Sequence, residues 1–250
     1  IPAGLFCGCG SLVSVSISSG ITNIGEIAFA GCRSLPSVAL PSSLTALGES
    51  AFLNCRSLLS LNIPAGIKSV SGQLCYECRS LTSLVLPSAV TNIGYSAFYN
   101  CAGLSSFAIP STVAVIAHDA FHGCSGLTSL TVNGALASVE DRAFYGCARL
   151  QTFFFYGTVA SLGVGVFGDC SSLYGVYFTG AVPSLGSDSG ADMFAAAGDV
   201  TVYHLSTSSG WGSMFCGAAA EQWKPGIVSL TTTASSFGFT GEWASGQTVR

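Results

Sequence analysis

The sequence contains few charged residues. Asp, Glu, Lys and Arg make up only 8% of its 250 residues, whereas about a quarter is typical of soluble domains. Twelve acidic and eight basic residues give a net charge of −4, and a nucleic-acid-binding surface requires an excess of Lys and Arg. We therefore predict no nucleic-acid partner.

Uninterrupted hydrophobic segments are also missing, although hydrophobic residues make up 49% of the chain. No window of about 20 residues lacks Ser, Gly, Asn and charged residues, so we predict no transmembrane helix and no membrane insertion. Residues 1–6 carry neither the basic start nor the apolar run of a signal peptide. They look like the end of a repeat unit already under way, so we expect a fragment or a processed product.

The hydrophobic residues instead recur with a period of 23 residues. A leucine stands three residues after each repeat cysteine, and a phenylalanine stands three residues before it, except where Cys75 replaces the phenylalanine. We call the repeat cysteines the cysteine ladder and number coils one to eight by them: Cys9, Cys32, Cys55, Cys78, Cys101, Cys124, Cys147 and Cys170. One repeat cannot bury its apolar residues alone, so the period predicts a solenoid in which each coil packs on the next.

Each coil is predicted to contain a short strand. Hydrophobic residues stand six and eight positions after the cysteine, as Leu61 and Ile63 do after Cys55. This alternation is typical of a strand, and strands of successive coils would pair in parallel about 4.8 Å apart. Proline, which can end the hydrogen-bond ladder, follows this strand in four coils, at Pro41, Pro64, Pro87 and Pro110.

The residue before the ladder cysteine is Gly or Asn in six of the eight coils, which predicts a left-handed backbone at that turn. Glu77 does not fit this bias. It shares coil four with Cys75, so we expect that coil to be the most distorted.

The pattern Leu-x-x-Leu-x-Leu-Pro-x-x-Leu-x-x-Ile-Gly-x-x-Ala-Phe-x-x-Cys resembles the BspA-like, or Treponema-type, leucine-rich repeat, and residues 78–100 match it at nearly every position. The resemblance extends over about residues 1–205 and recurs in every coil. It implies a leucine-rich-repeat solenoid with a parallel β-sheet. Such repeats are found mainly in surface or secreted proteins of bacteria and some microbial eukaryotes, several of them linked to adhesion, but the repeat alone identifies no ligand.

We predict three parts in the chain. Residues 1–205 form the solenoid, with an insertion loop near residues 187–191 and a last strand at residues 200–203. Residues 206–230 contain Trp211 and Trp223 and are predicted to cap the open end of the core. Residues 231–250, rich in Thr, Ser and Gly, are either a linker or the start of a truncated β module.

Eleven cysteines raise the question of disulfides or metal binding. Coils about 4.8 Å apart would bring neighbouring ladder cysteines within the Cα range of a disulfide. The ladder lies at an inward turn position, however, where Cys serves as a small apolar residue, so we predict buried, reduced thiols there and at Cys75. Cys7 and Cys216 lie outside the ladder and are either reactive or paired elsewhere. Cys75 and Cys78 form the only Cys-x-x-Cys pair, with no second pair at zinc-like spacing, so we expect no metal.

No motif predicts catalysis or a cofactor. The sequence has no nucleophile elbow, P-loop or dinucleotide-binding fingerprint. His118, Asp119 and His122 form the one local cluster that suggests metal binding or proton transfer. Because both histidines are expected to face outward, we interpret His122 as part of a row of exposed rings. We predict that the chain is not an enzyme and has no metal or cofactor.

Two rows of surface side chains along the turns are candidate binding residues. The first row is aromatic, and it either stacks on a sugar or protein partner or covers the edge of the core; it consists of Tyr76, Tyr99, His122 and Tyr145. The second row is Arg33, Arg56 and Arg79. Like charges at this spacing repel unless an anionic partner, or the nearby Glu26 and Glu49, neutralises them.

A third candidate lies on the outer face of the late strands. Early coils present Ser, Ala and Asn there, whereas coils seven and eight present Phe154, Tyr174 and Tyr177. Large rings on a rigid sheet suggest a contact site, unless the C-terminal cap covers them.

These features favour a non-enzymatic, extracellular or cell-surface module that binds or adheres to a protein or a glycan. The first alternative is a structural subunit that self-associates end to end, since the first coil has no polar cap of its own. The second is an accessory region of an enzyme whose catalytic domain lies elsewhere.

Overall fold

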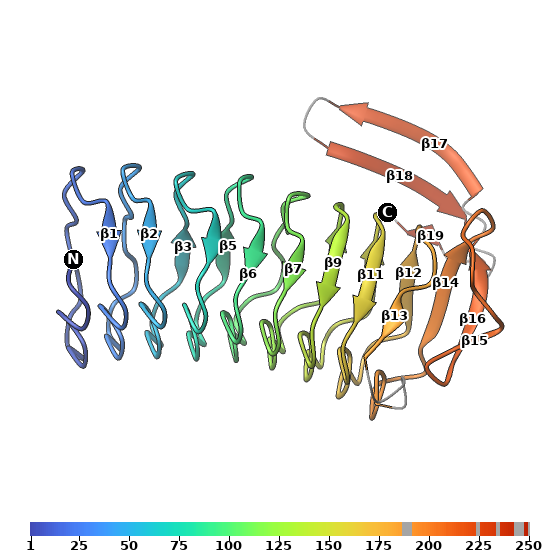
Figure 1. The fold of residues 1–250 in the computed structure, drawn as a ribbon, viewed down its shortest axis with the longest axis horizontal. Helices are drawn as coiled ribbons and strands as arrows, with labels where there is room; N and C mark the ends of the chain where they lie inside the picture. The colour runs from blue at the N-terminus through green and yellow to red at the C-terminus, as the bar shows by residue number, and fades with distance from the viewer. Residues whose placement is uncertain (187–191, 224–225, 234–235, 243–247, 250) are drawn as a thin grey trace.

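The chain folds into a solenoid whose coils stack along one axis from the N-terminus onward (Figure 1). This computed structural model describes residues 1–186, 192–223, 226–233, 236–242 and 248–249, and it describes side chains up to Trp223. The parallel solenoid with 23-residue coils is confirmed, and the described residues contain no helix. Accordingly, no segment of the described chain is a helix long and apolar enough to cross a membrane.

The first sheet contains the strands predicted after the ladder cysteines. In the later coils its strands are β8 (Ser129–Val132), β10 (Thr152–Phe155), β12 (Gly175–Phe178), β14 (Thr201–Leu205), β15 (Met214–Phe215) and β16 (Ala218–Trp223). They pair in the order β15–β16–β14–β12–β10–β8, all parallel except β15. Within β8, β10 and β12 paired residues are 23 apart, as Phe153 is from Leu130 and Val176. The sequence period therefore sets the register directly.

Proline shortens the same strands in the earlier coils. Tyr156 and Thr179 follow the late strands directly, and their N–H groups donate to the carbonyls of the preceding coil at 2.8 and 3.1 Å. Pro64 and Pro87 occupy the same position and have no N–H to donate. The strands before them, β3 (Ser60–Asn62) and β5 (Ser83–Val85), therefore end one position sooner and form a separate pair.

A second parallel sheet runs along another side of the coils and was not predicted. It contains β4 (Ser69–Val70), β6 (Asn92–Ile93), β7 (Val115–Ile116), β9 (Leu136–Val139), β11 (Val159–Leu162) and β13 (Ser184–Leu185). In coils one and two the same position holds the pair β1 (Asn23–Ile24) and β2 (Ala46–Leu47). Most of these strands have two residues, which is too short for an alternating pattern to be visible in the sequence.

Two columns of left-handed residues shape the turn of every coil. All eight residues before the ladder cysteines have positive φ, between 53° and 77°, which confirms the first column. Glu77 shares this conformation at 62°, so the expectation that coil four is distorted was wrong. The second column lies five residues before each cysteine and includes Ile27, Gln73 and Arg142. Its residue types vary too much to reveal the conformation, and cross-coil hydrogen bonds such as Ile27 N–H to Glu49 O at 2.9 Å help to hold it.

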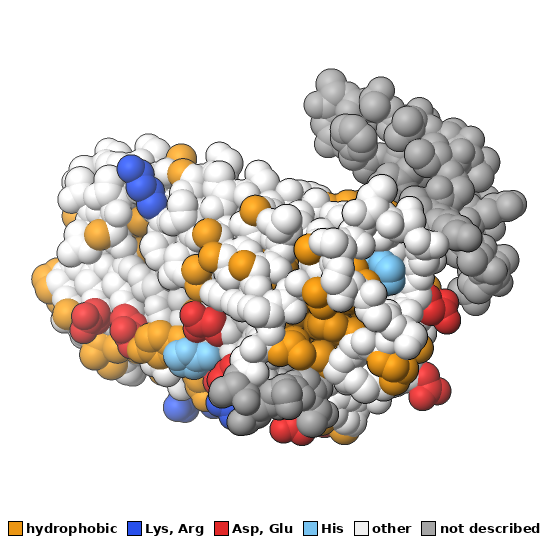
Figure 2. Space-filling model, turned by 45° about the vertical axis from the view of Figure 1, so that its right-hand side comes forward, with side chains coloured by type: hydrophobic (Ala, Val, Ile, Leu, Met, Phe, Trp, Pro, Cys, Tyr) orange, Lys and Arg blue, Asp and Glu red, His pale blue; other side chains and the backbone are white. Residues whose placement is uncertain are grey.

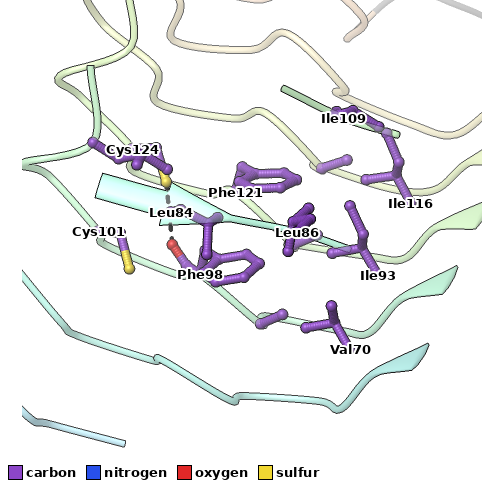
Figure 3. Close-up of a cluster of buried hydrophobic side chains, with 14 of the residues drawn as sticks. Val70, Leu84, Leu86, Ile93, Phe98, Cys101, Ile109, Ile116, Phe121 and Cys124 are labelled. Carbon is purple, nitrogen blue, oxygen red and sulfur yellow. Dashed lines mark hydrogen bonds between the residues drawn. The ribbon is translucent and has the colours of Figure 1, made fainter. Parts of the chain in front are cut away.

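Phenylalanine rings form the centre of the core. Phe98 stacks on Phe121 with ring centroids 5.3 Å apart, and Phe121 stacks on Phe144 at 5.4 Å. Figure 3 shows Phe98 and Phe121 one above the other beside the aliphatic residues of both sheets. Coil four replaces the usual Ala-Phe by Leu74 and Cys75, both fully buried. Leu74 supplies part of the volume that the missing ring would fill, which keeps the coil stacked.

The cysteine ladder is buried from Cys32 to Cys170, as predicted, but Cys9, in the first coil, is exposed. The thiols are also more than small apolar groups. Each buried ladder thiol donates to the carbonyl three residues before the cysteine of the preceding coil, and one of these bonds, from Cys124 to Phe98, is the dashed line in Figure 3. The seven distances lie between 3.1 and 3.3 Å. Cysteine thus fills the turn and ties adjacent coils together.

The last coils are closed by aromatic residues from the segment that follows them. Trp211 packs on Phe178 with centroids 5.0 Å apart and donates its Nε1–H to Gly180 O at 3.1 Å. Phe215 is buried against Trp211 and Phe178. The predicted last strand is present as β14, whereas the expected insertion loop at residues 187–191 lies outside the described residues.

The C-terminal segment forms a third sheet. Its antiparallel strands are β17 (Gly226–Thr233), β18 (Ser236–Glu242) and β19 (Thr248–Val249). The division into a solenoid, a cap at 206–230 and a linker or β module at 231–250 stays a prediction.

Candidate functional site

The aromatic row predicted on the turns is one continuous stack, which we call the tyrosine stack: Tyr76, Tyr99, His122 and Tyr145. Successive ring centroids are 4.7, 4.4 and 5.0 Å apart. The spacing follows from the fold, because equivalent residues of adjacent coils lie one strand spacing apart. All four side chains are partly exposed, and each stands two residues before its ladder cysteine, beside a core phenylalanine or Cys75.

The stack presents ring edges rather than ring faces. Each inner ring, Tyr99 and His122, has a neighbour on both sides. The outer face of Tyr145 lies against Gly168, where an added Cβ would be 2.7 Å from the ring. The faces between neighbouring rings are therefore closed to a ligand, and stacking of a sugar or protein partner on the row stays a prediction. What it offers is a ridge of ring edges and side-chain polar atoms.

Charged side chains are fixed along both sides of the stack. Glu77 accepts hydrogen bonds from Arg79 Nε at 2.6 Å and from Asn100 Nδ2 at 2.8 Å. The hydrogen bond from Arg79 is the main cause of the lowered pKa of Glu77. Asp119 binds His122 Nδ1 at 3.0 Å and Arg142 at 3.2 Å. At the end of the stack, a hydrogen bond to Asp169 raises the pKa of Tyr145. These contacts hold the polar groups in defined positions beside the rings.

A second, shorter stack runs parallel to the first and was missed by the sequence analysis. Tyr95 stacks on His118 at 5.3 Å, crosses over Gly72 and donates its hydroxyl to Glu49 two coils away. A Cβ on Gly72 would be only 2.3 Å from the Tyr95 ring, so glycine is required there. In the sequence, this arrangement is indicated only by Gly72, which stands in a repeat position that holds larger residues in the other coils. The reason for the glycine is the path of the Tyr95 side chain to Glu49, which lies 46 residues earlier in the chain.

The arginine row borders the tyrosine stack, and its three members differ in their partners. Arg33, Arg56 and Arg79 are all exposed. Arg79 forms an ion pair with Glu77 at 2.6 Å, and Arg56 donates to Asn54 Oδ1 at 3.4 Å. Among the described residues no ion pair joins the arginines to Glu26 or Glu49. In coil four the charge of Arg79 is therefore paired with Glu77. Arg33 in coil two and Arg56 in coil three form no ion pair with a described residue.

The cluster of His118, Asp119 and His122 does not converge on one point. Asp119 is occupied by His122 and Arg142, whereas His118 stacks on Tyr95. The backbone N–H of His118 donates to Glu140 at 3.0 Å. Within the described part of the chain, no group of three or more His, Cys, Asp or Glu side chains is placed to hold a metal ion.

The late aromatic residues are mostly covered by the chain itself. Tyr177 is only 5% exposed, because Phe154 and Tyr203 stack on its two faces at 4.4 and 4.7 Å and Trp223 packs edge-on at 5.6 Å. Phe154 is partly exposed, and Tyr174 is 50% exposed. The prediction of an open aromatic face was thus wrong for Tyr177, since two of its covering rings, Tyr203 and Trp223, come from the last strands.

One face of the molecule is sparse in charged side chains (Figure 2). In the view of Figure 2 most of the described surface is neither hydrophobic nor charged, and acidic side chains gather along its lower edge. The turns that carry the tyrosine stack thus combine stacked rings with charged side chains in fixed positions.

Comparison with known proteins agrees with this architecture. A model of the BspA-type leucine-rich repeat region matches residues 1–117 and 91–194, with six copies. The solved leucine-rich repeat protein of T. pallidum (TpLRR) is 35% identical, covers 60% of this chain and 70% of its own, and has a TM-score of 0.56. The pneumococcal vaccine antigen PcpA is 18% identical, with 84% of this chain and 61% of its own covered and a TM-score of 0.55, which shows a shared fold only. A search of curated proteins found no match.

The family model covers most of the chain, and it covers the coils that carry the cysteine ladder and the tyrosine stack. Its repeat is the one whose period sets the register of both sheets. The chain belongs to the BspA-type leucine-rich repeat family.

Proposed function

We propose that this chain is a non-enzymatic binding module of an extracellular or cell-surface protein, and that it recognises a protein partner through the turns of coils four to seven. The observation that carries the proposal is the tyrosine stack. The core uses an inward phenylalanine in every coil but coil four, and nothing in the core requires a ring at the next position. Coils two and three have Ala30 and Leu53 there and stack equally well.

The chemistry of the stack favours a protein over a glycan. A sugar packs its C–H groups on the face of a ring, whereas the inner rings Tyr99 and His122 have both faces covered by their neighbours. Ring edges with fixed carboxylate, amide and guanidinium groups suit side chains and backbone groups of a protein. Tyrosine also contributes a large contact area at a small loss of side-chain entropy. Tyr174, half exposed, is the ring that would serve a glycan instead.

The arginine row extends the proposed surface toward the N-terminus. Arg33 and Arg56 lie at the same edge of the turns and lack an ion-pair partner among the described residues. An acidic segment of the partner placed across them would relieve their repulsion. Phe154 and Tyr177 are left out of the proposed surface, because Tyr203 and Trp223 cover Tyr177.

End-to-end assembly has less support. One end of the solenoid is closed by Trp211 and Phe215, which pack over Phe178. A second copy stacked on that end would meet Trp211 and Phe215 in place of an open core, so head-to-tail growth would require these residues to move.

The test compares two double variants in binding to arrays of extracellular proteins and glycans. Tyr76→Ser with Tyr99→Ser removes half of the stack, and Leu59→Ser with Val85→Ser removes exposed apolar side chains next to β3 and on β5. A ring at the centre of an interface contributes about 1–3 kcal/mol, so we expect affinity for a protein partner to fall at least about tenfold in the tyrosine variant only. Loss of binding in the leucine–valine variant instead, or binding to glycans alone, would contradict the proposal.

A further inference from the structure

Coil four contains a second thiol that the binding surface does not explain. Every other coil has phenylalanine three residues before its ladder cysteine, but coil four has Cys75 before Cys78. Both residues are free thiols and both are fully buried. Two thiols therefore enter the core from a single turn.

The turn holds the two cysteines at the right separation for a bond. The N–H of Cys78 donates to Cys75 O at 3.1 Å, and Glu77 between them has a φ of 62°. The ends of a four-residue turn of this kind lie within about 7 Å between Cα atoms, and disulfides join Cα atoms about 4.4–6.8 Å apart. The turn itself therefore brings the two Cα atoms within the range of a disulfide.

Hydrogen bonding distinguishes Cys75 from the cysteine ladder. The buried ladder thiols donate to carbonyl groups of the preceding coil, whereas no such acceptor is found for Cys75 among the described residues. Its partner is the thiol of Cys78, and burial together with this contact raises the pKa of Cys75. A bond to Cys78 would therefore break one cross-coil hydrogen bond, from Cys78 to Phe52 O at 3.1 Å.

Cys147 and Cys170 are also neighbours, but they are less suited to a bond. They belong to different coils, so their thiols meet only after the solenoid has stacked. Both donate to carbonyls, at 3.3 and 3.2 Å, and a bond between them would break two cross-coil hydrogen bonds.

We propose that Cys75 and Cys78 form an intramolecular disulfide when the protein folds in the presence of a small disulfide such as oxidised glutathione. One cysteine thiolate attacks a sulfur of the oxidant and releases one glutathione thiolate. The second cysteine thiolate then attacks the mixed disulfide and releases the other. The two cysteines lose two protons and two electrons, and the glutathione disulfide gains both to become two glutathione thiols. This inference does not depend on the proposed binding function.

The bond forms before coil five stacks on coil four. In the folded chain both thiols are fully buried, so neither the oxidant nor solvent reaches them. Once formed, the disulfide fixes the turn between the two cysteines. This turn carries Tyr76, the first ring of the tyrosine stack, and Glu77, which forms the ion pair with Arg79.

The test is to refold the reduced, full chain from denaturant in a glutathione redox buffer, and then to denature it with an alkylating agent and map its peptides by mass spectrometry. We expect the peptide with Cys75 and Cys78 to be unlabelled and lighter by two hydrogens than its reduced form, and the other ladder cysteines to be labelled. Labelling of both residues, or a bond between Cys147 and Cys170 in their place, would overturn the proposal.

Two variants serve as controls. Leu74→Ala with Cys75→Phe restores the motif of the other coils, and Cys78 should then be labelled completely. Cys75→Ser keeps the size of the side chain and should give the same labelling of Cys78 if the double variant folds poorly. A blocked Cys78 in both variants would show that Cys75 is not its partner.

Discussion

The molecule contains two ring ladders built on adjacent positions of the same coils, and they differ in what holds them. Phe98, Phe121 and Phe144 are fully buried and stack 5.3–5.4 Å apart. Tyr99, His122 and Tyr145 stack at 4.4–5.0 Å while partly exposed. The inner ladder occurs in every coil but coil four, where Leu74 and Cys75 fill the core instead. The outer ladder occurs in four coils only, and this restriction makes it the more informative about function.

The largest expected effect comes from placing a charge among the inner columns. Leu81→Asp buries a carboxylate between Leu58 and Leu104, all fully buried, at a cost of several kcal/mol. Because each coil is stabilised by its neighbours, we expect the array to split into separately melting parts. Thermal unfolding followed by circular dichroism measures this. Thr82→Asp, on the exposed next position, is the control, and a wild-type melting curve for Leu81→Asp would refute the register.

The two ladders are compared most directly by truncating neighbouring residues. Phe98→Ala removes a fully buried ring and should cost about 3–5 kcal/mol. Tyr99→Ala removes a partly exposed ring with two stacking contacts and should cost about 1–2 kcal/mol. Urea unfolding of both variants gives the difference. Equal costs would mean that the outer ladder is as structural as the inner one, which would weaken the proposed function.

The cross-coil thiol bond should have a moderate effect. Cys124→Ala removes one of the two donors to Phe98 O, which keeps the bond from the Cys101 N–H at 3.2 Å, so the change should cost about 0.5–1.5 kcal/mol. Cys216→Ala, outside the ladder and partly exposed, should cost much less. If urea unfolding shows the two variants to be equally stable, the ladder cysteines act only as small apolar residues.

Titration of the ladder thiols has no effect on stability near neutral pH and lowers the free energy of unfolding only at alkaline pH. Burial raises the pKa of Cys124 from 9.0 to about 12. The unfolded chain therefore loses its proton first, so stability is unchanged below pH 9 and falls between pH 9 and 12. Each such thiol contributes a slope of about 1.4 kcal/mol per pH unit. Urea unfolding across this range, with Cys124→Ser as the comparison, should show a shallower slope in the variant.

Thiol labelling of the native protein separates the ladder from the other cysteines. Cys7 and Cys9 are exposed and should react first with a thiol reagent. Cys216, whose pKa burial raises to about 11, should follow slowly. The buried thiols should react only after denaturation. Rapid reaction of most thiols in the native protein would show that the ladder is not buried.

The sequence by itself determined the repeat, its register and the inner core. With a period of 23 residues, each inward residue packs on the equivalent residue of the next coil. The burial of Leu81, Phe98 and Cys124 therefore follows from their positions in the repeat. The left-handed turn before each cysteine was predicted from the Gly and Asn residues that recur at this position of the repeat. Glu77 stands at the same position and has the same left-handed conformation.

Only the tertiary structure decided what each surface row can do. Coil spacing turned the predicted row of exposed rings into a stack that hides its faces, and the closing strands covered Tyr177. The reach of Tyr95 to Glu49, the second sheet and the thiol-to-carbonyl bonds were equally invisible. These features depend on distances between coils and on what covers an outward position. A repeat pattern fixes which side of the chain a residue faces, but the residue's contacts depend on neighbours that lie one or two coils away.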